Sequence, residues 1–167
     1  MTCGTFKWDF FKTRLLSWID LIYFDIKCID DHLHRQWTGR SNQGILANFS
    51  RLAKTAPDKV ICSVPLIEGL TAGRGNLRLL AIYIGNSAAL PYRLRAYRPG
   101  FHFKAKALGK IPAPYLPLHA MAPGEFNRIA AEFEKIVSRL NRKAGSGVNA
   151  IKNPMDHTQK VRFYERQ

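Results

Sequence analysis

Cysteines and long apolar runs are scarce in this sequence, and each shortage excludes a class of protein. Three cysteines occur among 167 residues, at positions 3, 28 and 62. They are too few and too scattered for a disulfide framework or a cysteine-rich metal cluster, so we interpret them as structural thiols. No apolar run approaches the roughly 20 residues that span a bilayer, and the N-terminus lacks the pattern of a signal peptide. We therefore expect a soluble, cytoplasmic protein with no membrane segment.

Acidic residues are also scarce, since 12 of them stand against 26 lysines and arginines for a formal net charge of +14. None occurs between Glu68 and Glu125. Such an imbalance predicts attraction to polyanions or to an acidic partner, but it does not bear on the fold. The hydrophobic content of 46% excludes a disordered chain and is sufficient for a domain with a core.

Apolar patterning predicts helices that alternate with strands. We expect helices over about 7–19, 41–54, 76–85 and 123–142, and strands over 21–28, 60–67 and 92–97. Ser41 is the expected N-cap of the second helix, while the segments after residue 28 and after residue 97 are expected to be loops. This alternation predicts an α/β fold with a parallel sheet over residues 1–143, followed by a flexible basic tail at 144–167.

Two charged residues interrupt the first apolar strand, LIYFDIKC at 21–28. Asp25 and Lys27 are two positions apart, so their side chains lie on the same face of the strand. Burying both charges is costly unless they contact each other or a ligand. Ligands of parallel sheets bind beyond the carboxyl ends of the strands, and both residues lie toward that end. A structural Asp25–Lys27 pair and a ligand site are both open interpretations.

A series of short motifs points to a family. The pieces are TCG at 2–4, DLIYFDIKCIDDHLHRQWTGRSNQGILANFSRLA at 20–53, VPLIEG at 64–69 and Y-x10-LG at 97–109. From residue 2 to about 140, their order and spacing resemble the C-terminal half of a glycyl-radical-enzyme activating enzyme. These enzymes form the pyruvate formate-lyase activase family of radical S-adenosylmethionine (SAM) proteins. The resemblance implies the C-terminal part of a radical SAM partial (β/α) barrel, beginning at the end of the third barrel strand.

The resemblance also implies a cofactor site. In the family, the lysine of the DxK motif reaches the SAM carboxylate, and the aspartate helps to bind a cation beside the same pocket. Carried over, Lys27 would be an anion clamp and Asp25 a cation or polar-network ligand, with Thr2 and Tyr23 near that cation position. Arg98 stands where the activases carry a histidine near SAM. Two interpretations of Arg98 are open: a contact to an anionic group, or an exposed arginine of a loop.

Several features of the family are missing from this sequence. Its radical chemistry requires a [4Fe–4S] cluster on three cysteines at CxxxCxxC spacing, and no such motif occurs here. The glycine-rich GGE segment is missing too, and Ser63 replaces the arginine usual before PLI. We therefore predict a truncated or split activating protein that cannot bind the cluster alone and is inactive alone. Its expected partners are a glycyl-radical enzyme or a separate N-terminal half.

Two roles without catalysis are alternatives. The stretch ALPYRLRAYRPGFHFKAKALGK at 89–110 interleaves aromatic residues with six lysines and arginines, a composition typical of single-stranded nucleic-acid binding. Tyr92 and Leu94 in this stretch also fit a core strand. Alternatively, the segment at 21–28 would be an unpaired sheet edge and dock a partner protein. The histidines His32 and His34 are expected to be solvated in a loop rather than to bind metal.

Overall fold

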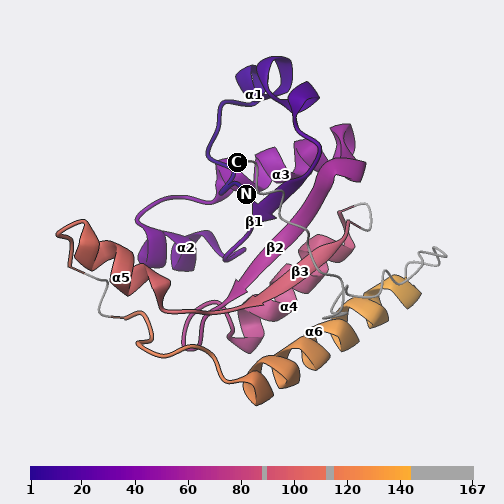
Figure 1. Ribbon diagram of the computed structural model, residues 1–167. Helices are drawn as coiled ribbons and strands as arrows, with labels where there is room; N and C mark the ends of the chain where they lie inside the picture. Colours follow the sequence, from indigo (N-terminus) through magenta and orange to yellow (C-terminus); the bar gives the residue numbers. More distant parts are fainter. Residues whose placement is uncertain (88–89, 112–114, 144–167) are drawn as a thin grey trace, which may run out of the picture.

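A computed structural model describes residues 1–87, 90–111 and 115–143 and has a three-stranded parallel sheet at its centre (Figure 1). The strands are β1 (Ile22–Asp25), β2 (Val60–Leu66) and β3 (Tyr92–Ala96), in the spatial order β1-β2-β3. Parallel pairing aligns Asp25 with Ser63, and Pro65 with Arg95. The α/β fold with a parallel sheet is therefore confirmed. Within the described residues β1 is the outer strand of this sheet, but the expected unpaired edge is wrong over part of its length, because Thr2 makes a parallel bridge to Phe24.

Helices connect the strands and follow the last of them. They are α1 (Trp8–Arg14), η1 (Leu16–Trp18), α2 (Asp31–Thr38), α3 (Gln43–Thr55), η2 (Pro57–Lys59), α4 (Arg74–Gly85), α5 (Gly100–Ala107) and α6 (Pro123–Lys143). One face of the sheet carries Phe24, Val64 and Leu94, which join the hydrophobic core. Buried side chains of α3, α4 and α6 complete that core, so the helices predicted over about 41–54, 76–85 and 123–142 are confirmed.

The first helix is shorter than its sequence predicts. α1 ends at Arg14 and a 3-10 turn follows, whereas the apolar spacing indicated one helix over 7–19. Phe11 faces the core and stacks on Phe6, with 4.0 Å between the ring centroids, while Phe10 is 61% exposed. The prediction of one continuous helix was wrong because the α-helical hydrogen bonds end with that from the Leu15 N–H to the Phe11 carbonyl, and the next bond, from the Trp18 N–H to the Leu15 carbonyl, is that of a 3-10 turn.

The loop expected after β1 is a helix. Asp30 caps α2 through a hydrogen bond that its side chain accepts from the Leu33 N–H, at 2.9 Å, and Gly39 ends the helix with φ +74°. His34 is buried on this helix, with Nδ1 2.7 Å from the Arg40 carbonyl, so its prediction as a solvated loop residue was wrong. His32 is exposed, as expected.

Two further differences concern helix α3 and the stretch after β3. The N-cap of α3 is Asn42 rather than Ser41. The proline-rich stretch expected as one long loop contains helix α5, which follows Pro99 directly. In Figure 1, α2 and α5 lie at the end of the sheet to which the strands point, opposite α1.

Two further expectations concern the C-terminal tail and membrane-spanning helices. The predicted basic tail at 144–167 lies outside the described residues. In the described ranges, no helix combines the length and the apolar character needed to cross a bilayer.

Candidate functional site

The face of the sheet opposite the core is polar. Side chains alternate along a strand, so Tyr23 and Asp25 lie on the opposite side of β1 from the buried Phe24. The strand register places Ser63 beside Asp25, while Arg95 lies further along on β3. A carboxylate, a hydroxyl and a guanidinium thus share this face at the carboxyl end of the sheet, where parallel sheets bind their ligands.

Asp25 is the centre of an ion-pair cluster on this polar face. Its Oδ2 lies 2.7 Å from Nζ of Lys27, and its Oδ1 lies 2.8 Å from Nη2 of Arg95. The Ser63 hydroxyl donates a longer hydrogen bond to Oδ1, at 3.5 Å. Asp25 is 9% exposed, whereas the side chains of Lys27 and Arg95 are 37% and 34% exposed. The carboxylate is therefore held inside, while both cations reach the surface.

The cluster retains positive charge and unused hydrogen-bonding groups. Two cations share the single carboxylate of Asp25, which leaves one positive charge in excess. Among the described residues, three buried side-chain atoms lack a hydrogen-bond partner, namely Arg95 Nε, the Tyr97 hydroxyl and Asn42 Oδ1. Burial also raises the pKa of Tyr97. Unpaired buried donors are costly, so this end of the sheet is suited to an anionic or polar ligand that would satisfy them.

Buried asparagines fix the backbone around Lys27. The side-chain amide of Asn76 donates to the carbonyl of Lys27 at 2.9 Å, and Asn42 donates to the carbonyls of Cys28 and Ile29, each at 2.9 Å. These amides satisfy carbonyls that leave the sheet ladder after β1. The main chain of Lys27 is thus held while its ammonium group reaches the surface.

The N-terminal segment is tied to the same strand. The Thr2 N–H donates to the Tyr23 carbonyl, and the Thr2 carbonyl accepts from the Asp25 N–H, both at 2.9 Å. Two residues later the chain turns at Gly4 with φ +80°, where the buried Asn48 donates to the Gly4 carbonyl at 2.9 Å. The backbone of Thr2 is therefore adjacent to the ion-pair cluster.

The structure brings together most of the site residues predicted from sequence. Thr2, Tyr23, Asp25 and Lys27 lie along β1 and its edge, and the structural Asp25–Lys27 pair is present. Arg98 is exposed and, in the part of the chain described, makes no side-chain hydrogen bond or ion pair. Its prediction as a contact to an anionic group remains untested.

Sequence reasoning missed the role of Arg95 and of the asparagines. Arg95 occurs in YRLRAY, where the alternation of arginines with Leu94 marks a face opposite the core. That signal identifies the face, but it does not identify Asp25 as the partner. The asparagines Asn42, Asn48 and Asn76 have no comparable signal, since they bond main-chain carbonyls far away in the sequence.

The cysteines do not fit an iron–sulfur cluster. Cys28 and Cys62 are buried, and desolvation raises the pKa of both thiols. Cys3 is exposed, and a hydrogen bond with the Thr5 side chain lowers the pKa of its thiol. Within the described ranges, no three histidine, cysteine or acidic side chains come together as a metal site. Three thiolate ligands for a [4Fe–4S] cluster are therefore not available from these residues.

Comparison with known proteins places this geometry in context. The chain is 30% identical over 132 residues to the choline trimethylamine-lyase activating enzyme of Oleidesulfovibrio alaskensis, which is 79% of this chain and 36% of that enzyme. It is 35% identical over 78 residues to the trans-4-hydroxy-L-proline dehydratase activating enzyme of Clostridioides difficile, covering 47% of this chain and 25% of that enzyme. No protein-family model matches.

A solved structure supports the same relationship at the level of fold. A domain of pyruvate-formate lyase-activating enzyme from Bacteroides vulgatus ATCC 8482 superimposes with a TM-score of 0.51 and 22% identity, over 72% of this chain and 63% of that one. The chain spans 36% of the length of the choline trimethylamine-lyase activating enzyme. The chain is thus similar in sequence to glycyl-radical enzyme activating enzymes over a part of their length, and its fold is similar to that of the pyruvate-formate lyase-activating enzyme domain.

Proposed function

We propose that this chain contributes the SAM-binding end of a glycyl-radical enzyme activating protein of the radical SAM type. The family reaction is the reductive cleavage of SAM and the formation of a glycyl radical on a partner enzyme. The observation that carries the proposal is the cluster of Asp25, Lys27 and Arg95 at the carboxyl end of the sheet. Its excess positive charge suits the SAM carboxylate.

Lys27 is the residue that would contact the ligand. Its side chain is 37% exposed and therefore free to turn from Asp25 toward a carboxylate. Arg95 would remain on Asp25 at that moment, so the buried carboxylate keeps a partner in both states. Asp25 would be a ligand of a cation or of a polar network beside the SAM pocket, with Thr2 and Tyr23 near that cation position. Arg98 would supply a second anion contact from the segment after β3.

SAM, when bound, supplies the 5′-deoxyadenosyl group of the family reaction. The electron that this chemistry requires comes from a [4Fe–4S] cluster, and the cysteines of this chain do not fit one. We therefore infer that these 167 residues bind SAM without cleaving it, and that residues outside them hold the cluster. A cytoplasmic location and a glycyl-radical enzyme as the final partner belong to the same proposal.

Isothermal titration of the purified chain with SAM tests the binding step. We expect Lys27→Gln to weaken SAM binding by about tenfold, the size of one charge-assisted contact, and Lys54→Gln on the exposed surface of α3 to leave it unchanged. Absence of binding by the unchanged protein, or equal binding by both variants, would contradict the proposal.

A second experiment tests the inference that this chain alone is inactive. The purified protein is reconstituted with iron, sulfide and a reductant, incubated with SAM, and assayed by chromatography for 5′-deoxyadenosine. We expect none above a control without protein. Formation of 5′-deoxyadenosine together with an iron–sulfur electron paramagnetic resonance signal would show that the chain holds a cluster, and the inference would then be withdrawn.

The alternative prediction of nucleic-acid binding has less support from the contacts. Tyr92, one of the interleaved aromatic residues, packs edge-on against Phe133 with 5.2 Å between the ring centroids, and Leu94 is buried. Tyr92 and Leu94 on β3 therefore belong to the core and are not free to bind bases. The aromatic residues on α5, Phe101 and Phe103, are exposed.

A further inference from the structure

Helix α5 and the residues after it present apolar side chains to solvent. The strongly exposed members are Phe101 (49%), Phe103 (75%), Leu108 (70%) and Ile111 (93%). Single exposed apolar side chains are ordinary, but four within eleven successive residues are not. Two of them, Phe103 and Ile111, line the same pocket and form an apolar patch with it. A patch of this kind marks an interaction surface.

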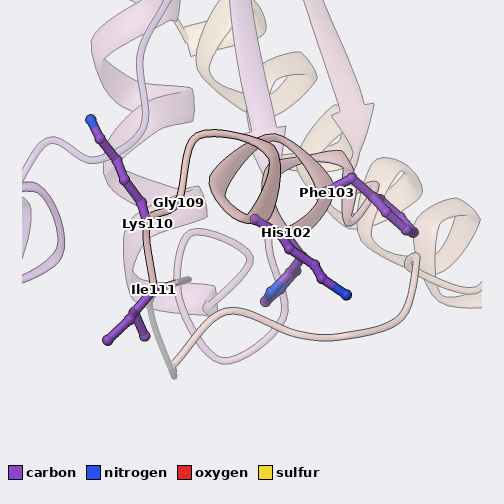
Figure 2. A pocket seen from close by; sticks show the side chains of 6 residues that line it. His102, Phe103, Gly109, Lys110 and Ile111 are labelled. Carbon is purple, nitrogen blue, oxygen red and sulfur yellow. The ribbon is translucent and has the colours of Figure 1, made fainter.

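A pocket of about 460 Å³ lies within this patch and is lined by His102, Phe103, Lys106, Gly109, Lys110 and Ile111. Figure 2 shows Phe103 on one side of the pocket and Lys110 with Ile111 on the other. The pocket is open toward solvent, and its exposed wall is almost entirely apolar, so the lining lysines contribute their aliphatic stems to it. Such a wall suits a single apolar side chain.

The backbone turn that builds the pocket is well defined. Gly109 adopts φ +63°, its N–H donates to the Lys106 carbonyl at 3.0 Å, and the Lys110 N–H donates to the Ala105 carbonyl at 2.8 Å. These two bonds form the Schellman motif that ends a helix at a left-handed glycine. The turn directs Lys110 and Ile111 back beside α5, so the pocket exists before any ligand arrives.

The pocket is anchored to the body of the protein. Ala105 is the buried residue of α5, and the ring nitrogen Nε2 of His102 lies 3.1 Å from the carbonyl oxygen of Pro117. The Tyr115 hydroxyl donates to the Trp37 carbonyl of α2 at 2.9 Å. The apolar side chains of the patch are therefore held outward on a fixed support, which lowers the entropic cost of binding.

The charge around the pocket has one sign. Among its lining residues the charged ones are Lys106 and Lys110, and Lys104 lies on the same helix as Lys106. Negative charge beside an apolar group therefore makes a partner complementary to this lining.

We propose that this pocket docks an acidic peptide segment of a partner protein. One aromatic or branched aliphatic side chain of the segment occupies the pocket between Phe103 and Ile111, and flanking carboxylates pair with Lys106 and Lys110. The anchor supplies most of the affinity, while the charges steer the approach and set the register. The site does not depend on SAM binding by Lys27.

A peptide fits the pocket better than a nucleic acid does. Phe101 and Phe103 are two positions apart on a helix and project to different sides, so they do not form one platform for stacked bases. The rings of Phe101 and His102 are also steeply inclined to each other, at 76°. A concave pocket is instead suited to a single side chain.

Fluorescence anisotropy with the complete chain tests the proposal. The probe is a labelled peptide of about ten residues, with one phenylalanine flanked by glutamates and aspartates. Matched peptides carry serine in place of the phenylalanine, or lysines in place of the acids. We expect the acidic phenylalanine peptide to bind at least about tenfold more tightly than either matched peptide, the size of one well-buried anchor.

Variants of the chain distinguish peptide binding in the pocket from nonspecific attraction by the net positive charge of the protein. Phe103→Ser and the pair Lys106→Glu/Lys110→Glu change exposed side chains, and each is expected to weaken peptide binding about tenfold. Phe10→Ser and the pair Lys12→Glu/Lys54→Glu make the same chemical changes at exposed positions elsewhere and should have no comparable effect. Each variant is checked for an unchanged circular dichroism spectrum.

The same titrations include the other possible occupants of the patch. Tighter binding of a single-stranded oligonucleotide or of anionic phospholipid vesicles than of the peptide would overturn the proposal. So would equal peptide binding by pocket and control variants. Self-association that disappears in Phe103→Ser would assign the patch to a second copy of this chain instead. SAM titration of the same variants should be unchanged, so the outcome here is distinct from that of the proposed SAM site.

Discussion

Arg95 on β3 reaches past the intervening strand β2 to the carboxylate of Asp25 on β1, where Nη2 and Oδ1 lie 2.8 Å apart. The small side chain of Ser63, fully buried on β2 between them, leaves room for this contact. Lys27 holds the second carboxylate oxygen. The three strands of the described sheet are thus joined on their polar face by a single acidic group.

This contact predicts energetic coupling between the two outer strands. We expect Asp25→Asn to lower the free energy of unfolding by about 1–3 kcal/mol, because it leaves Lys27 and Arg95 close together without a counter-charge. Arg95→Leu should cost about 1 kcal/mol, since its side chain is one-third exposed and partly screened. Urea denaturation of both variants and of the double variant measures the coupling. Additive effects would show that the two residues do not interact energetically.

Asn76 gives a second prediction, for the backbone that carries Lys27. Its buried amide donates to the carbonyls of Lys27 and Thr71, at 2.9 and 2.8 Å. Asn76→Ala leaves both carbonyls with fewer partners and should lower the free energy of unfolding by about 2–3 kcal/mol in urea denaturation. Asn127→Ala on the exposed face of α6 is the matched control and should change stability little. Equal losses of stability in the two variants would contradict the prediction that Asn76 holds the backbone of Lys27 in place.

The sequence predicts part of the ion-pair cluster for a simple geometric reason. Alternation alone places Asp25 and Lys27 on one face, and the structure shows them 2.7 Å apart. The contact with Arg95 depends on the order of the strands and on their register, and neither follows from the sequence pattern of β3 alone. The polar partner of a buried charge can therefore lie far from it in sequence, here by 70 residues.

The elements that the sequence pattern missed share a physical cause. Helix α2 has few apolar side chains, so periodicity gives little signal, although its cap Asp30 and its terminal Gly39 are both visible in the sequence. Helix α5 buries the small Ala105 and exposes the large Phe103, so the positions of its apolar residues do not indicate which side of the helix is buried. By contrast, β2 is buried along most of its length and α6 contributes core residues from Phe126 to Val137, and both elements were predicted almost to the residue.

Gly4 provides a third prediction, at the turn that brings Thr2 to β1. Its φ is +80°, and a Cβ atom at this position would overlap the ring of Phe24, which is fully buried. Gly4→Ala combines backbone strain with a steric clash and should lower the free energy of unfolding by at least about 2 kcal/mol. Gly44→Ala in α3, where a Cβ would meet nothing within 4 Å, should be neutral or stabilise the helix by up to about 1 kcal/mol. Thermal and urea denaturation of the two variants compare these effects directly, and a tolerated Gly4→Ala would contradict the close packing of this turn.

Asp31 predicts how stability changes with pH. Its carboxylate accepts hydrogen bonds from the Ser41 hydroxyl at 2.6 Å, from Arg35 Nε at 2.8 Å and from the Asn42 N–H at 2.8 Å. These contacts lower the pKa of Asp31 to about 2, with the Ser41 bond as the largest cause. The unfolded chain binds this proton more tightly than the folded one, so the stabilisation is complete above about pH 4 and is lost as the pH falls toward 2.

The substitution Asp31→Asn isolates this carboxylate from the other acids. The variant should melt at a lower temperature than the unchanged protein at neutral pH, and the difference should shrink between about pH 4 and pH 2, where the native carboxylate becomes protonated. Asp58→Asn, at an exposed position of η2, changes the net charge equally and serves as the control. Melting temperatures from circular dichroism over this range measure the difference. If the difference in melting temperature between the two proteins stayed constant down to pH 2, the contribution of Asp31 to stability would not depend on its charge. That result would contradict the prediction.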